Sequence, residues 1–185
     1  FSNSGIEEVL IPETVETIKD RAFGSFTYNK ETGEFTTVGE LTIYGKKESE
    51  AEKYANKYGF TFVGFETALG VDALIDAIGD VDENSEESIT VARDMYDKLS
   101  DDQKGNVTKL NVLEAAEIVL SKIKADKAAA ANVDKLIGNI GSVSKNSKTK
   151  ITTARNAYNK LTADQKKLVT KLDVLIAAEK RYPQI

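Results

Sequence analysis

The stretch VDALIDAIG at residues 71–79 returns 62 positions later as VDKLIGNIG at residues 133–141, and this recurrence governs how the whole chain is interpreted. The match runs without a gap from residues 71–120 to residues 133–182, and 28 of the 50 aligned residues are identical. Tandem copies usually build length, valency or a scaffold, because a catalytic centre gains little from being duplicated on one chain. The sequence therefore predicts a repeat protein, in which we call these two ranges the first repeat and the second repeat.

Each repeat has the apolar spacing and the capping residues of three short helices. The first helix is predicted from apolar residues three and four positions apart, which are Val71, Leu74, Ile75 and Ile78. Ser85 is the predicted N-cap of a second helix, and Ser100 with Gln103 forms a capping box that opens a third. Asn111, like Asp173 in the second repeat, is expected to cap a restart of that third helix. We expect two tandem three-helix bundles.

The segment between the repeats, KADKAAAAN at residues 124–132, contains neither Gly nor Pro and is rich in Ala, the best helix former. We expect the last helix of the first repeat to run through it, the alternative being a break at this linker. The predicted domains are residues 1–65, a helical bundle at 66–123, the linker, and a second helical bundle at 133–185.

The two repeats differ in charge, although the formal net charge of the whole chain is only −5. Residues 71–123 carry 13 acidic and 5 basic side chains, a net charge of −8, whereas residues 133–185 carry 4 acidic and 11 basic ones, a net charge of +7. Lys145, Lys148 and Lys150 crowd a predicted helix start, where the helix dipole disfavours positive charge. We expect them to bind something acidic: the first repeat, a neighbouring molecule or an anionic wall polymer.

Three polar side chains recur on predicted facing helices and are candidate structural residues. They are Arg93, Tyr96 and Glu117 in the first repeat, and Arg155, Tyr158 and Glu179 in the second. The arginine and the glutamate are expected to form an interhelical ion pair, the alternative being an arginine that holds a carboxylate or phosphate of a ligand. The tyrosine is expected to be a core ring with its hydroxyl at the rim, rather than a platform for stacking sugars.

The composition excludes most catalytic and metal chemistry. The chain has no His and no Cys, and so lacks the commonest general base, the commonest zinc ligands and every thiol. Asp80, Asp82 and Asn84 are spaced like the start of a calcium loop, but Ser85 and Val91 stand where such a loop needs Gly and Glu. No apolar run approaches the length of about 20 residues that a membrane span needs. We expect no enzyme activity, no cofactor and no metal.

Residues 1–65 lack helical periodicity and contain the string VLIPETVETIKDRAFGSF at residues 9–26. This string resembles the BspA-like leucine-rich repeat of surface proteins, with the pattern L-x-x-I-x-I-P-x-x-V-x-x-I-x-x-x-A-F. Residues 29–33, NKETG, are expected to form the turn of an inserted hairpin. The string GKKESEAEKYANKYGFTFV at residues 45–63 is similar to the segment that closes such arrays, where a helix and a strand cover the last open edge.

The repeats are also similar to the helical modules that lie between working domains and the wall anchor of Gram-positive secreted proteins. The similarity rests on VDALIDAIG at residues 71–79, the pattern A-R-x-x-Y-x-x-L at residues 92–99, and TADQKKLV at residues 162–169. Together the two resemblances imply an extracellular protein attached to a bacterial cell surface, with its signal and anchor outside this stretch of sequence.

The fold we expect is a multi-domain α+β chain, with a short β-rich leucine-rich-repeat end and its capping helix followed by two tandem three-helix bundles. We expect it to serve as a non-catalytic structural and interaction segment, a helical stalk presenting a leucine-rich-repeat recognition domain. Its expected partner is a protein or a cell-wall or host glycan and not nucleic acid, and the chain is expected to be a monomer. The alternatives are helical modules that themselves bind a host protein or glycan, and an accessory region of a secreted enzyme.

Overall fold

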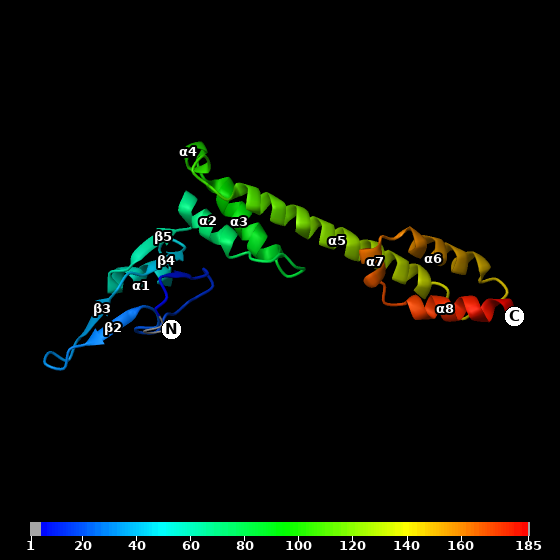
Figure 1. Cartoon of the computed structure of the whole chain (residues 1–185), viewed down its shortest axis with the longest axis horizontal. Coiled ribbons are helices and arrows are strands. Elements are labelled where there is room, and N and C mark those ends of the chain that lie inside the picture. Colours follow the sequence, from blue (N-terminus) through cyan, green and yellow to red (C-terminus); the bar gives the residue numbers. More distant parts are fainter. Residues whose placement is uncertain (1–4, 185) are drawn as a thin grey trace. The chain divides into compact units, whose positions relative to one another are not determined.

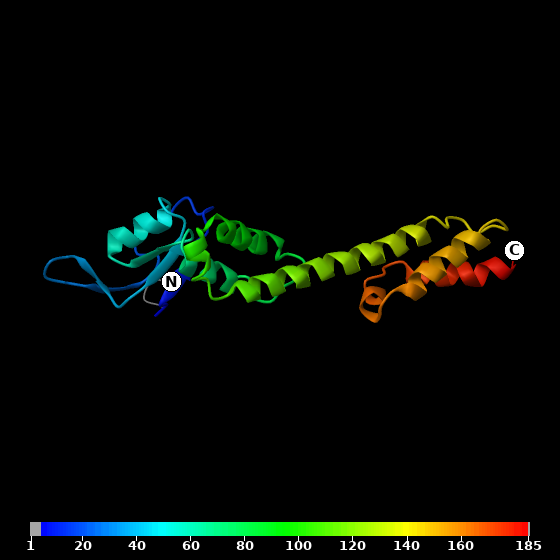
Figure 2. The same cartoon turned by 90° about the horizontal axis from the view of Figure 1, so that it is seen from above.

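The computed structural model describes residues 5–184 and shows an α+β protein, with small sheets in its N-terminal part and helices in its C-terminal part (Figure 1; Figure 2 shows the view from above). The chain divides into two compact units, which meet in the sequence between Glu117 and Ile118. Unit 1 therefore contains the sheets together with most of the first repeat, and unit 2 contains the second repeat.

A three-stranded parallel sheet organises the N-terminal part of unit 1. Its strands are β1 (Glu8–Leu10), β4 (Thr42–Gly45) and β5 (Thr61–Gly64), and they lie side by side in this order. The register places Val9, Ile43 and Phe62 next to one another, so equivalent positions of successive strands form a ladder across the sheet. Helix α1 (Glu50–Tyr58) precedes β5 and starts at Ser49, whose side chain accepts a hydrogen bond from the Ala51 amide.

The expected hairpin is present between β1 and β4. Strands β2 (Ser25–Tyr28) and β3 (Phe35–Val38) pair antiparallel and form a second sheet (Figure 1). The Asn29 carboxamide closes the turn by accepting hydrogen bonds from the amides of Glu31 and Thr32. The hairpin is thus held by local bonds that its own turn sequence supplies.

The core of this N-terminal part lies between the parallel sheet and α1. Its buried members are Ile11, Leu41, Ile43, Ala51, Tyr54, Ala55 and Phe60. The Tyr54 hydroxyl donates to the Phe23 carbonyl at 2.7 Å and accepts from the Phe23 amide at 2.9 Å. This pair of bonds fixes the irregular segment after β1 against α1.

The first repeat follows β5 directly. Its helices are α2 (Ala68–Asp76), α3 (Glu86–Lys98), the short α4 (Asp101–Lys104) and the long α5 (Leu110–Gly138). Helix α2 begins so close to the sheet that a Cβ on Gly70 would lie 2.1 Å from the Gly64 carbonyl oxygen, a position that only glycine can occupy. This close approach joins the first repeat to the sheet within one compact unit.

Unit 2 contains the later part of α5, α6 (Lys148–Lys160), α7 (Ala163–Lys167), α8 (Leu172–Arg181) and the 3-10 turn η1 (Tyr182–Gln184). Residues 124–132 lie inside α5. A buried apolar cluster of this unit comes from α5, α6 and α8 and the turn after α5, and it consists of Val133, Ile137, Ile140, Ile151, Ala154, Leu175 and Ala178. Gly141 follows with φ +61°, as does Gly79 in the first repeat, and each turns the chain after a helix end.

The capping predictions hold in part. Both capping boxes are present, Ser100 with Gln103 and Thr162 with Gln165. Ser85 stands at the N-cap position of α3 without capping it, because its hydroxyl accepts instead from the Asp82 amide in the preceding loop.

The expected caps at Asn111 and Asp173 are wrong. Helix α5 begins at Leu110 and α8 begins at Leu172, so each of these residues already lies inside its helix. The amides before these two helices are satisfied by a side chain from another helix, described below.

Candidate functional site

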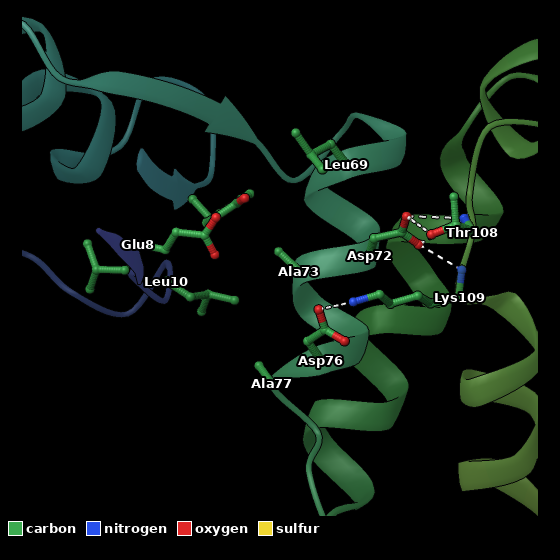
Figure 3. Close-up of a pocket in the computed structure, with 11 residues that line it drawn as sticks. Glu8, Leu10, Leu69, Asp72, Ala73, Asp76, Ala77, Thr108 and Lys109 are labelled. Carbon is green, nitrogen blue, oxygen red and sulfur yellow. Dashed lines mark hydrogen bonds and ion pairs between the residues drawn. The ribbon is translucent and has the colours of Figure 1, made fainter. Parts of the chain in front are cut away.

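Asp72 on α2 is the most completely bonded acidic side chain of unit 1. It is 7% exposed. Its carboxylate accepts from the Thr108 amide at 3.1 Å, the Thr108 hydroxyl at 2.7 Å and the Lys109 amide at 3.0 Å (Figure 3). These amides precede α5 and have no partner within the helix, so Asp72 caps α5 from a distance in the sequence. The Asp72 carboxylate therefore has a structural role, which is to stabilise the start of α5.

The second repeat contains the same arrangement. Asp134 accepts from the Thr170 hydroxyl at 2.7 Å, the Thr170 amide at 3.0 Å and the Lys171 amide at 2.8 Å. Burial acts to raise the pKa of Asp134, but the bonds from Thr170 and Lys171 outweigh it and hold the pKa below its ordinary value. The sequence contained the signal, because the aspartate, the threonine and the lysine recur unchanged in both repeats.

A cavity of about 400 Å³ lies beside this bond network, between β1 and α2 (Figure 3). Its walls hold two carboxylates that are already paired, since Asp76 forms an ion pair with Lys109 and Asp72 is bonded as described. Burial, and secondly the negative charge of Glu8, raise the pKa of the Tyr44 phenol. The cavity therefore has a phenol that keeps its proton and carboxylates that are already bonded to other groups. These groups are better suited to hydrogen-bonding a polar ligand than to transferring protons.

The recurring arginine and glutamate form a two-point ion pair in each repeat. Arg93 Nε and Nη2 donate to the Glu117 carboxylate at 2.7 and 2.8 Å, and the corresponding distances from Arg155 to Glu179 are both 2.6 Å. The hydrogen bond from Arg93 is the main reason that the pKa of Glu117 lies below its ordinary value. The Nε–Nη2 edge of each arginine is thus engaged by a glutamate of its own repeat.

The recurring tyrosines lie beneath positively charged side chains. The Arg93 guanidinium lies 5.3 Å and the Lys104 ammonium 5.6 Å from the centre of the Tyr96 ring. In the second repeat the Tyr158 ring packs against the core, with Arg155 at 5.4 Å and Lys166 at 5.6 Å from its centre, a geometry that favours cation–π attraction. These rings serve packing, which leaves little ring face for stacking sugars.

The three predicted binding lysines lie at the exposed loop and first turn of α6. The side chains of Lys145, Lys148 and Lys150 are exposed, and within residues 5–184 none of their ammonium groups has a hydrogen-bond or ion-pair partner. The Lys145 carbonyl accepts from the Tyr182 hydroxyl at 3.4 Å. We call these three residues the lysine corner.

The loop that begins like a calcium site is closed by its own side chains. Asp82 accepts from the Asn84 amide at 2.8 Å and from the Ser85 hydroxyl at 3.1 Å, and the first of these bonds is the main cause of its lowered pKa. In the second repeat Ser144 and Ser147 form the same turn. Among the described residues no three metal-ligating side chains lie together in a way that would hold a metal ion.

A second cavity, of about 560 Å³, lies between the end of β1 and α3 and was not predicted. Its apolar lining includes Leu10, Pro12, Phe65, Leu74, Val91 and Met95, and its charged lining consists of Glu13, Glu87, Asp94 and Lys98. We call it the acidic groove. Sequence reasoning missed it because its two sides are some 80 positions apart, but one signal was present: the second repeat has Thr153 and Ala157 where the first has the apolar Val91 and Met95.

Several large apolar side chains are exposed. On the hairpin, Tyr28 and Phe35 are 50% and 49% exposed, with ring centres 4.9 Å apart. The Arg21 guanidinium lies 4.1 Å from the centre of the Phe35 ring. On α5, Ile118 is 71% exposed. Single exposed apolar side chains are ordinary on protein surfaces, whereas neighbouring ones, such as Tyr28 with Phe35, can form an interaction surface.

None of the helices described here combines the length and the hydrophobicity that crossing a membrane requires. The resemblances to leucine-rich repeats and to Gram-positive helical modules rest on the sequence patterns quoted above. Comparison of the chain with protein-family models, with curated proteins and with solved structures found no match.

Proposed function

We propose that this chain is a non-catalytic structural and interaction segment of an extracellular bacterial cell-surface protein, in which two tandem three-helix bundles carry the end of a leucine-rich-repeat recognition domain. The observation that carries the proposal is that the polar side chains that recur in both repeats are bonded inside the repeats. Arg93 with Glu117, and Asp72 with Thr108, are bonded inside the first repeat, and their equivalents are bonded in the same way inside the second. The conserved chemistry of the repeats thus builds their architecture.

The N-terminal sheet supports the leucine-rich-repeat part of the proposal. Successive strands of a solenoid stack in parallel with equivalent positions in register, so that each turn continues the core of the previous one. The ladder of Val9, Ile43 and Phe62 has this arrangement, and the next positions, Leu10, Tyr44 and Val63, form a second ladder. Helix α1 and β5 correspond to the segment whose sequence resembles the end of such arrays.

The proposed interaction partner is a protein or a cell-wall or host glycan. The paired rings of Tyr28 and Phe35 on the hairpin support an interaction through the N-terminal part, because half-exposed aromatic rings can stack on sugars or on apolar side chains. The hairpin is held by its own turn, so both rings can be replaced without disturbing the core.

A second candidate function, in which the helical modules themselves bind a partner, is favoured by one observation. Ile118 on α5 is 71% exposed and its neighbour Val119 is 43% exposed, whereas the second repeat has Lys180 and Arg181 at the equivalent positions. An apolar pair that is exposed in one copy and charged in the other is a feature of a contact surface rather than of the shared architecture.

Two matched double variants of the whole chain separate these candidates. The first, Tyr28→Ser with Phe35→Thr, alters the hairpin, and the second, Ile118→Lys with Val119→Arg, introduces the residues of the second repeat. Binding of both to purified bacterial cell wall, to host extracellular proteins and to a panel of glycans is compared with that of the unaltered chain. We expect the hairpin variant to lose binding and the α5 variant to keep it. The opposite pattern would favour the second candidate, and turnover of any substrate in the panel would contradict both.

Amide hydrogen exchange of the whole chain tests the structural part of the proposal. If α5 serves as a helical spacer, amides of residues 124–132 exchange slowly, on the timescale of amides 133–137 in the same helix. Exchange at the rate of an unstructured peptide would show that these residues act as a loose linker, and would overturn the stalk.

A further inference from the structure

The two units carry opposite net charges. Residues 1–117 contain 25 acidic and 11 basic side chains, a net charge of −14, and residues 118–185 contain 5 acidic and 14 basic ones, a net charge of +9. The reversal also occurs at equivalent positions of the repeats, since Lys145 and Lys148 stand where the first repeat has Glu83 and Glu86. Two copies of one module have therefore kept their internal bonds and acquired surfaces of opposite sign.

The acidic groove combines an apolar floor with carboxylates that have no partner. Glu87 and Asp94 are exposed at its rim, and within the described part of the chain neither has a hydrogen-bond or ion-pair partner. Glu13 also lines the groove, but it is paired with Lys46 at 2.8 Å, and the ammonium group of Lys98 adds one positive charge to the lining. The second repeat has the neutral Thr149 and Asn156 at the positions of Glu87 and Asp94, so the acidic rim is a feature of the first repeat alone.

The lysine corner has the complementary chemistry. Its three ammonium groups are unpaired, and Lys148 and Lys150 lie in the first turn of α6, where the helix dipole makes a positive charge unfavourable. A lysine side chain has a long apolar stem that packs on apolar surface while its ammonium group stays at a polar edge. An apolar groove with carboxylates at its rim matches both parts of this side chain.

We propose that the acidic groove binds the lysine corner of a second copy of this chain. The contact is heterologous, because each copy offers one groove and one corner, and it can repeat from copy to copy. It involves few side chains and exposed charges, so it is weak and weakens further as ionic strength rises. The expected monomer is then the high-salt state. This inference goes beyond the proposed function and does not depend on it.

Sedimentation velocity of the whole chain over a range of protein concentrations tests the proposal. At about 20 mM NaCl, where the screening length is long, the average mass rises with protein concentration, and at about 500 mM NaCl it returns to that of the monomer. A chain that stays monomeric at low salt overturns the proposal. A salt-dependent change that does not depend on protein concentration also overturns it, because the contact would then lie within one chain.

The lysine corner is tested against a control with the same change in net charge. Lys145→Gln, Lys148→Gln and Lys150→Gln together weaken association at low salt about tenfold or more. The control replaces three other lysines of unit 2 by Gln, namely Lys135, Lys160 and Lys167. We expect the control to weaken association only slightly. Equal losses in both variants would mean that overall charge, and not the corner, drives association.

The groove is tested with residues that the second repeat already tolerates. Glu87→Thr with Asp94→Asn introduces the equivalent residues of the second repeat, so folding is preserved, and we expect the same loss of association as for the corner variant. Retained association would place the contact outside the groove and overturn the proposal.

A charge swap tests whether the groove and the lysine corner contact each other directly. A chain that carries all four substitutions, Glu87→Lys, Asp94→Lys, Lys148→Glu and Lys150→Glu, again has opposite charges on groove and corner, and it is expected to regain the association that each pair of substitutions alone loses. A synthetic peptide of residues 143–152 serves as a probe of the groove. If the peptide binds the groove while the chain itself never associates, the occupant is a basic segment of another protein and the second-copy proposal is wrong.

Discussion

The first and second repeats have the same internal bonds in different surroundings. Asp72 is 7% exposed next to the sheet of unit 1, whereas its equivalent Asp134 makes the same bonds but is only partly buried. The capping-box glutamines differ in a similar way, because Gln103 also donates to the Glu66 carbonyl and Gln165 donates instead to the Asp126 carboxylate. Outside their shared bonds, each repeat is adapted to its own neighbours.

The two repeats share many internal contacts and differ mainly at their surfaces. Many of the residues that bond or pack within a repeat are the same in both copies, whereas many of those that face outward differ in polarity or charge. Val91 and Met95 line the acidic groove, and the second repeat has Thr153 and Ala157 at these positions. Each repeat therefore serves as an internal control for the other, and substitutions made in pairs measure what the surroundings contribute.

The largest expected effect comes from the shared core. Leu113 and Leu175 are equivalent and both 0% exposed, so Leu113→Ala and Leu175→Ala each remove a fully buried side chain and leave a cavity. We expect each to lower the free energy of unfolding by about 3 kcal/mol, measured by urea denaturation with far-ultraviolet circular dichroism. Val112→Ala and Val174→Ala are the matched controls at exposed positions, and they should change stability by less than about 0.5 kcal/mol.

The next effect should differ between the copies. Asp72→Ala leaves two amides and a hydroxyl buried without a partner, and we expect a loss of about 2 kcal/mol. Asp134→Ala leaves the same groups more open to water, and we expect about 1 kcal/mol. Urea denaturation of both variants measures the difference, with Asp80→Ala at an exposed position as the control. Equal losses would show that the sheet next to α2 contributes nothing to the strength of this bond.

The ion pairs should have similar effects in both copies, with a defined pH dependence. Glu117→Gln and Glu179→Gln each remove a carboxylate that is about one-third exposed, so we expect at most about 1 kcal/mol at neutral pH. The bonded arginine lowers the pKa of each glutamate, so this stabilisation is present above the pKa of the unfolded chain and is lost as pH falls through the lower folded-state pKa. The stability difference between each variant and the unaltered chain should therefore shrink between about pH 6 and about pH 3. A difference that is independent of pH would contradict the ion-pair interpretation.

The smallest effect concerns the start of α6. Lys148→Glu gives the second repeat the residue that the first has at Glu86, and it replaces a charge that the helix dipole disfavours by one that it favours. We expect unit 2 to gain about 0.5 kcal/mol in thermal or urea unfolding at low salt, with Lys160→Glu at the other end of the helix as the opposite case. A loss of stability would show that Lys148 has a partner inside its own chain.

Much of the repeat could be predicted because its determinants are local or recur. The capping boxes of Ser100 and Thr162 depend on residues three positions apart, and the ion pair of Arg93 with Glu117 was indicated by its reappearance in the second copy. The caps at Asn111 and Asp173 were predicted wrongly, because Asp72 and Asp134 satisfy those helix starts from 36 residues away. The recurrence of Asp72 as Asp134 was the sequence signal that would have identified these two long-range caps.

The sequence by itself determined the duplication, the positions of most helices, the opposite charges of the two copies and the absence of histidine and cysteine chemistry. These properties follow from composition and from contacts within a few turns of helix. Only the tertiary structure decided which surfaces border a cavity: Pro12 and Met95 both line the acidic groove, and no periodicity connects them. Which residues line a cavity depends on how whole elements pack, because the free energy of apolar burial depends on the total area buried and not on the spacing of any two residues in the sequence.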